Sequence, residues 1–161
     1  MADQIGKNKD YNESRQLINE IIVELFNNIL MIEERSLIKK GISLSMTEVH
    51  TIEAIGIGNK RTMSDIAEDL EITMGTLTTM ITKLERKGYV QRERASKDRR
   101  VVLASLTEKG EEIEQTHRDF HDEMIDHLMA DLKLDEDRAL ILALKNINDF
   151  FIREYGGNNG H

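Results

Sequence analysis

Two short helical patterns followed at once by two strand-like patterns occupy residues 62–106, and this order constrains the fold more than any other feature. Thr62 and Thr73 each precede an apolar repeat of three and four residues, so each is expected to cap a helix, over 63–70 and 74–87. Gly88 marks the end of the second helix. The runs 89–94 and 101–106 read as strands around a polar loop. This order predicts a winged helix-turn-helix.

The remaining chain is expected to be helical. A wide apolar stripe continues to about Ile38 and stops at Gly41, and Ser45 with Glu48 predicts a capping box for a helix that ends around 56–58. Thr107 is expected to cap a helix reaching 132, and Asp135 a last helix reaching 154. The predicted fold class is therefore mostly α with a small β-hairpin wing. We expect a flexible N-terminus at 1–11, a helical dimerisation region at 12–40 and 107–154, a DNA-binding region at 41–106 and a flexible tail at 155–161.

Positive charge is concentrated in one segment of an acidic chain. Residues 73–106 hold eight Lys or Arg and three acids, whereas the whole chain has a formal net charge of -8. Such a distribution predicts a polyanionic partner that touches only this segment. A solvated charged loop is the alternative explanation of the charge by itself.

The polar face of the predicted helix 74–87 is suited to reading DNA, because its first turns are small and hydroxylic and its end is basic. The candidate contacts on this recognition helix are Gly75, Thr76, Thr78, Thr79, Thr82, Lys83 and Arg86. The loop 95–100 is expected to enter the adjacent minor groove. Its candidate contacts are Lys97, Asp98, Arg99 and Arg100, with Asp98 holding the Arg100 guanidinium in one orientation.

The stretch LERKGYVQRERASKDRRVVLASLTEKG resembles the signature of the MarR-type winged-helix transcription regulators. Its features are a Leu-x-x-x-Gly helix end, a basic strand, Asp-x-Arg in the wing and Leu-Thr-x-x-Gly. The resemblance implies a homodimer built from the first helix and the two C-terminal helices. It gives Asp98 and Arg100 the wing roles. Two-fold symmetry then predicts a pseudo-palindromic operator in double-stranded DNA.

Four shorter stretches, FNNILMIEE, TEVHTIEAIG, GTLTTMITKLERKGY and HRDFH, are similar to the fatty-acid-synthesis repressors of that family. The resemblance implies long-chain acyl-ACP, the acylated carrier protein, as co-repressor. The helix that begins at Met46 is then expected to line an effector cavity with neighbouring helices. The candidate lining residues are Phe26, Ile29, Leu30, Val49, His50, Ile52, Phe120 and Met124. A basic cluster of Arg35, Lys39 and Lys40 would contact the carrier protein, or else only stabilise a helix end.

Zinc is the rival effector. His117 and His121 lie four residues apart on one predicted helix face, and His50 and Glu33 could complete a site, because neutral imidazoles with one carboxylate suit Zn²⁺. A zinc-responsive repressor, or a regulator of another small-molecule response, would share the same DNA-binding region.

Other classes of function find no support in the residues. The chain has no cysteine, no Gly-rich phosphate loop and no catalytic triad in context, so we expect neither an enzyme nor a cofactor. A protein-interaction module would leave the winged helix unexplained. No apolar run is long enough for a membrane span, and the polar start lacks a signal peptide, so a soluble cytoplasmic protein is expected.

Overall fold

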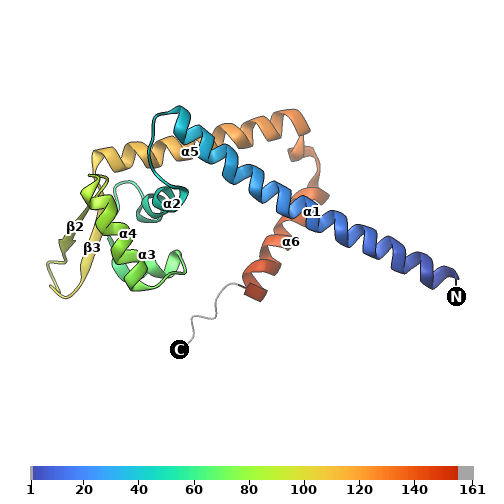
Figure 1. The fold of residues 1–161 in the computed structure, drawn as a ribbon, viewed down its shortest axis with the longest axis horizontal. Helices are drawn as coiled ribbons and strands as arrows, with labels where there is room; N and C mark the ends of the chain where they lie inside the picture. The colour runs from blue at the N-terminus through green and yellow to red at the C-terminus, as the bar shows by residue number, and fades with distance from the viewer. Residues whose placement is uncertain (1, 156–161) are drawn as a thin grey trace. The chain divides into compact units, whose positions relative to one another are not determined.

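The computed structural model describes residues 2–155, with side chains placed for 10–134 and 136–155. This part of the chain is mostly helical with one three-stranded sheet (Figure 1), which confirms the predicted fold class. The chain divides into two compact units, Met1–Met46 and Thr47–His161. No helix among the described residues is long and apolar enough to cross a membrane.

The first unit is built on one long helix, α1 (Ala2–Lys39). It begins well before the apolar stripe, so residues 2–11, which the composition predicts to be a flexible end, are helical. Once a helix is nucleated, each further residue adds a backbone hydrogen bond at little cost. Gly41 ends the helix with φ of 72°, and the amide of Ile42 donates to the Leu37 carbonyl at 2.9 Å. The predicted stop at Gly41 is therefore confirmed.

Three short helices form the core of the second unit: α2 (Met46–Ile55), α3 (Met63–Asp69) and α4 (Met74–Arg86). The predicted caps are confirmed, because Thr62 Oγ1 accepts from the Asp65 amide at 3.1 Å and Thr73 Oγ1 from the Thr76 amide at 3.2 Å. The largest fully buried side chains of the unit come from these helices and the first strand of the hairpin: Val49, Thr51, Ile52, Ile55, Ile66, Leu77, Ile81, Leu84 and Val90.

The hairpin consists of β2 (Val90–Arg94) and β3 (Val102–Leu106), paired antiparallel with Val90 opposite Leu106 and Arg94 opposite Val102. A third strand, β1 (Arg61–Thr62), pairs with the other edge of β3 and gives the order β1-β3-β2. The sequence did not indicate β1. Two residues are too few for an alternation pattern, so only their pairing with β3 makes them a strand.

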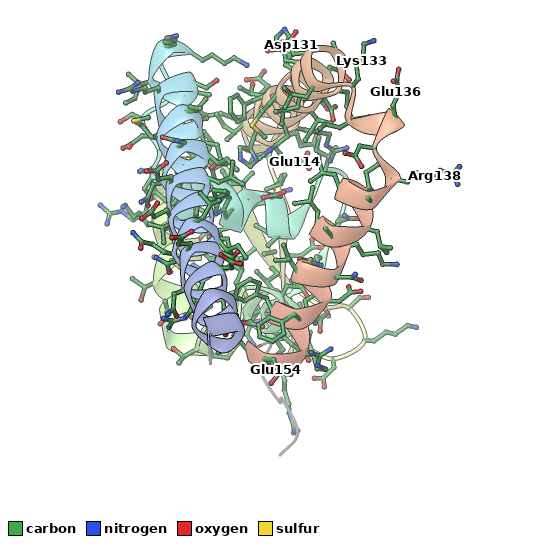
Figure 2. All side chains as sticks on the ribbon, turned by 90° about the vertical axis from the view of Figure 1, so that its right-hand side faces the viewer. Glu114, Asp131, Lys133, Glu136, Arg138 and Glu154 are labelled. Atoms are coloured by element: carbon green, nitrogen blue, oxygen red, sulfur yellow. The ribbon has the colours of Figure 1, made fainter. Side chains whose placement is uncertain are left out.

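The C-terminal part contains α5 (Glu108–Leu132), a 3-10 turn η1 (Leu134–Glu136) and α6 (Arg138–Tyr155). Lys133 adopts a left-handed conformation with φ of 48° and ends α5; Figure 2 shows Lys133 and Glu136 at this bend. The amide of Leu140 donates to Asp137 Oδ1 at 3.0 Å, so Asp137 has the capping role predicted for Asp135. The intervening 3-10 turn delays the helix start. The predicted tail lies, apart from Tyr155, outside the described residues.

Candidate nucleic-acid interface

The outward face of α4 carries the seven residues that the sequence predicts to contact DNA. On the opposite side Leu77, Ile81 and Leu84 are completely buried, which leaves the helix only one free face. Six of the seven side chains or glycines on that face are exposed, and Thr82 is half-buried: Gly75, Thr76, Thr78, Thr79, Thr82, Lys83 and Arg86. The segregation of apolar and polar faces therefore follows the periodicity, as predicted.

Three of the four threonine hydroxyls on this face are engaged within α4 itself, whereas Thr76 Oγ1 lies 2.9 Å from the hydroxyl of the capping residue Thr73. Thr78 Oγ1 donates to the Met74 carbonyl at 2.7 Å, Thr79 Oγ1 to Gly75 at 3.0 Å and Thr82 Oγ1 to Thr78 at 2.7 Å. Each hydroxyl hydrogen is thereby used, and the side chain keeps a methyl group and an acceptor oxygen for other contacts. In a major groove those two groups match the thymine methyl and the amino groups of adenine and cytosine.

A carboxylate of α2 holds two lysines at the C-terminal end of α4. Glu48 Oε1 lies 2.7 Å from Lys87 Nζ and 3.1 Å from Lys83 Nζ. The Glu48 side chain is only 6% exposed, whereas the Lys83 side chain is 60% exposed. Arg86, between the two lysines, is exposed and has no ion pair among the described residues. The three cations of this helix end are therefore not equivalent.

The loop between β2 and β3 presents Lys97, Arg99 and Arg100 to solvent, as predicted for a wing. Asp98 Oδ1 accepts a hydrogen bond from the backbone nitrogen of Arg100 at 2.9 Å. The expected contact of Asp98 with the Arg100 guanidinium is not found among the described residues. With the Val101 amide donating to the Asp98 carbonyl at 3.0 Å, this contact fixes the turn of the chain instead of the side chain.

Two further arginines belong to this surface, and the prediction missed both. Arg92 of β2 binds Glu85 of α4, with Nε 3.1 Å from Oε2, and so joins the hairpin to the helix. Arg94 is exposed and its Nη1 donates to the Arg99 carbonyl at 3.2 Å. Strand alternation places both on the same side of β2 as the buried Val90, which by itself predicts inward-facing side chains; their place in the basic run beside the wing is the signal that could have identified them.

Two arginines of the second unit have perturbed acidities. The side-chain hydrogen bond from Arg61 to Asp69 raises the pKa of Arg61, and Arg61 Nη1 also donates to the Ala54 carbonyl at 2.7 Å. On α5 the hydrogen bond to Glu114 raises the pKa of Arg118. Both groups are fully charged at neutral pH, so Arg61 acts as a permanent link between α2, β1 and α3.

Comparisons with known proteins place this arrangement in a family. A model of the MarR family matches residues 44–102, which hold α2, β1, α3, α4, β2 and the start of β3. The HTH-type transcriptional regulator SarZ of Staphylococcus haemolyticus is 34% identical over 104 residues, which cover 65% of this chain and 69% of SarZ. The chain belongs to the MarR family.

Solved structures agree with that assignment. The crystal structure of Streptococcus pneumoniae FabT in complex with DNA is 39% identical with a TM-score of 0.78, covering 84% of this chain and 96% of FabT. The transcriptional regulator BldR from Sulfolobus solfataricus is 26% identical with a TM-score of 0.62, covering 88% of this chain and 96% of BldR. This MarR-family chain is a DNA-binding transcriptional regulator and not an enzyme.

The residues predicted for an effector pocket of this MarR-family protein are distributed over both units. Phe26, Ile29 and Leu30 lie on α1 in the first unit. In the second unit Val49 and Ile52 are completely buried in the core of α2. His50, Phe120 and Met124 are half-buried, and Met124 lines a shallow hollow of about 330 Å³ on α5 with His127, Leu128, Asp131 and Leu132. Val49 and Ile52 therefore serve the packing of this unit, whatever else they contact.

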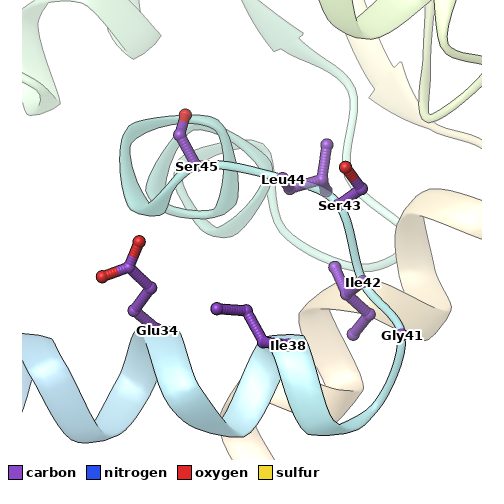
Figure 3. Close-up of a pocket in the computed structure, with 7 residues that line it drawn as sticks. All are labelled: Glu34, Ile38, Gly41, Ile42, Ser43, Leu44 and Ser45. Carbon is purple, nitrogen blue, oxygen red and sulfur yellow. The ribbon is translucent and has the colours of Figure 1, made fainter.

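A larger hollow lies in the first unit, at the end of α1. Its volume is about 420 Å³, and Figure 3 shows Glu34 and Ile38 of α1 facing the segment from Gly41 to Ser45 that completes its lining. Two serines and one carboxylate make this lining mixed in polarity. It does not offer the long apolar cavity that an acyl chain needs. The predicted carrier-protein cluster, Arg35, Lys39 and Lys40, is exposed on the same end of α1.

Three of the four predicted metal ligands gather in the second unit. His117 Nε2 and His121 Nε2 lie 3.2 Å apart on α5, and the ring of His50 on α2 has its centroid 5.6 Å from that of His117. Glu53, which the prediction did not include, has Oε2 3.9 Å from His117 Nδ1. Glu33 belongs to α1 in the other unit.

Proposed function

We propose that this MarR-family protein is a homodimeric, sequence-specific transcriptional repressor. In this proposal α4 occupies the major groove and the wing loop 95–100 enters the minor groove. The observation that carries it is the outward face of α4, where an exposed hydroxylic stretch ends in lysine and arginine beside a basic wing. The likeness to a FabT crystallised with DNA supports the same use of this surface.

The test measures binding of the protein to a promoter duplex by fluorescence anisotropy at several salt concentrations. Phosphate contacts require an affinity that falls steeply with salt, with a slope of about 0.9 per phosphate on logarithmic axes. The variant Arg99→Ala with Arg100→Ala is expected to reduce that slope. Weak binding whose affinity does not change with salt concentration would overturn the proposal.

Exposed apolar surface supports the dimer. No residue of α6 is buried within the chain, although Leu140, Ile141, Leu144, Ile147 and Phe151 recur on it at helical spacing with 37–51% exposure. On α1 the apolar side chains of Leu17, Ile18, Ile21, Leu25 and Phe26 are also more than half exposed. Surfaces of this kind are covered by a partner in stable proteins. Sedimentation equilibrium is expected to give twice the mass of one chain.

The regulated process in this proposal is fatty-acid synthesis, with long-chain acyl-ACP as co-repressor. Its support is the 39% identity to FabT over 84% of the chain and the exposed cluster of Arg35, Lys39 and Lys40, which would suit an acidic carrier protein. An operator titration with acylated and unacylated carrier protein tests this role. Tighter binding with the acylated form alone supports it, and equal binding with both forms contradicts it.

A zinc-responsive repressor is the second candidate, and one distance favours it. Two nitrogen ligands of a tetrahedral zinc ion at bond lengths of about 2.05 Å lie about 3.3 Å apart. The 3.2 Å between His117 Nε2 and His121 Nε2 matches that spacing. Competition with a chromophoric chelator would measure zinc affinity directly, with His117→Ala and His121→Ala as the variants and His127→Ala as the control. Unchanged affinity in both variants would exclude the site.

A further inference from the structure

The ion pairs of Glu48 connect α2 with the end of the recognition helix, and the sequence motifs do not account for them. Glu48 Oε1 is shared by Lys87 Nζ at 2.7 Å and Lys83 Nζ at 3.1 Å. A buried carboxylate requires a partner, because an unpaired charge in the interior is costly. Lys87, whose side chain is 33% exposed, is the closer and more enclosed of the two cations. It can satisfy Glu48 without Lys83.

Lys83 lies on the face proposed to meet DNA. It follows Thr79 by four residues and precedes Arg86 by three, so all three share one side of α4. Its side chain is 60% exposed, which allows the ammonium group to turn from the carboxylate to a phosphate. The same cation thus has two anionic partners available, one inside the protein and one on the DNA.

We propose that Glu48 is a positioning residue that competes with a DNA phosphate for Lys83 and thereby limits the affinity of the recognition helix for DNA. This inference rests on the proposed use of α4 in DNA binding. In the free protein Glu48 holds Lys83, so a phosphate gains this cation only by replacing an existing ion pair. The net contribution of Lys83 to binding is therefore small while Glu48 is charged, and Arg86 carries no such restriction.

A double-mutant cycle measures this competition on a promoter duplex. Glu48→Gln keeps the side-chain volume and removes the charge, so Lys83 becomes available to one phosphate in each protomer. The affinity of Glu48→Gln for the duplex is expected to exceed that of the wild type. Because a dimer gains two phosphate contacts, the ratio of the variant's affinity to the wild-type affinity is expected to fall by roughly tenfold between about 50 and 200 mM salt. Lys83→Met is expected to change affinity little by itself and to abolish the gain in the Glu48→Gln background.

Arg86→Met is the matched control, with the same effect expected in both backgrounds. If Glu48→Gln does not fold, as judged by circular dichroism, Glu48→Met with Lys87→Met replaces the buried carboxylate and its half-buried partner by apolar groups and also releases Lys83. The same steeper salt dependence is expected. If Glu48 had a purely structural role, Glu48→Gln would lower thermal stability and leave the salt dependence of DNA binding unchanged. Lys83→Met would then have equal effects in the wild type and in Glu48→Gln. That result would overturn the inference, whereas salt-insensitive binding by the wild type would instead overturn the proposed function.

Discussion

The carboxylate of Asp98 accepts a hydrogen bond from the backbone nitrogen of Arg100, at 2.9 Å, and this contact shapes the tip of the wing. Because the acceptor binds the chain and not the guanidinium, an amide oxygen at the same place should serve equally well. Asp98→Asn is therefore expected to bind promoter DNA at least as tightly as the wild type, since it also removes a negative charge near the phosphates. Asp98→Ala loses the hydrogen bond, and affinity is expected to fall about fivefold, corresponding to about 1 kcal/mol. Anisotropy titrations at one salt concentration compare the three proteins, and a loss in Asp98→Asn as large as in Asp98→Ala would contradict the backbone role.

The recognition helix should read thymine through methyl groups. The hydroxyls of Thr78 and Thr79 donate to carbonyls of their own helix, so valine preserves the group that remains for an apolar contact. Thr78→Val and Thr79→Val are expected to retain operator affinity within about twofold. Serine lacks the methyl group. Each threonine-to-serine substitution at a thymine methyl is therefore expected to cost about 0.8 kcal/mol of binding free energy, or about fourfold in affinity. Deoxyuridine in place of thymidine in the duplex removes the same contact from the other side. On the deoxyuridine duplex the serine variants should then bind as tightly as the wild type. A loss of affinity as large as on the thymidine duplex would argue against methyl recognition.

Two glycines in helices are expected to respond to alanine in opposite ways. A Cβ added at Gly110 of α5 would lie 2.1 Å from the Tyr89 carbonyl oxygen, which is backbone and cannot turn aside. Gly110→Ala is therefore expected to destabilise the protein by about 1–3 kcal/mol in urea unfolding. At Gly75 of α4 the nearest atom is 3.9 Å away, so Gly75→Ala should stabilise the fold by about 0.5–1 kcal/mol. Its new methyl group stands on the proposed DNA face, and operator affinity should decrease while stability increases. A stable Gly110→Ala protein would show that the start of α5 can move away from the hairpin.

Thr107 joins the start of α5 to the turn between α4 and β2 through two hydrogen bonds of one hydroxyl. Its Oγ1 accepts from the Gly110 amide at 3.2 Å and donates to the Gly88 carbonyl at 2.7 Å. Thr107→Val removes both and is expected to lower the free energy of unfolding by about 1–2 kcal/mol. Thr107→Ser retains the hydroxyl and should unfold within about 0.5 kcal/mol of the wild type. A larger loss in Thr107→Ser than in Thr107→Val would assign the effect to the methyl group and not to the cap, because valine keeps that methyl group.

The winged helix itself was predictable, because local hydrogen bonds define its parts. Thr62, Thr73 and Thr107 each cap a helix by accepting a hydrogen bond from the backbone amide three residues further along the chain. Such contacts depend only on neighbouring residues. The polar face of α4 follows from the spacing of Leu77, Ile81 and Leu84 in the same way. Local pattern also misplaced two boundaries: it put the start of α1 after residue 11, and it cannot distinguish Asp135 from Asp137 as the start of α6.

The sequence by itself thus determined the helices, the hairpin and the residues that face outward from α4. The tertiary structure decided the partners of those residues. Glu48 pairs with Lys87, 39 positions away, and Arg92 pairs with Glu85 on another element. The strand β1 exists only by its pairing with β3. Periodicity reports the environment of a residue relative to its own helix or strand, whereas an ion pair between elements depends on how they pack together. For this reason the motifs pointed to Lys83 as a DNA contact, and only the folded chain revealed the carboxylate beside it.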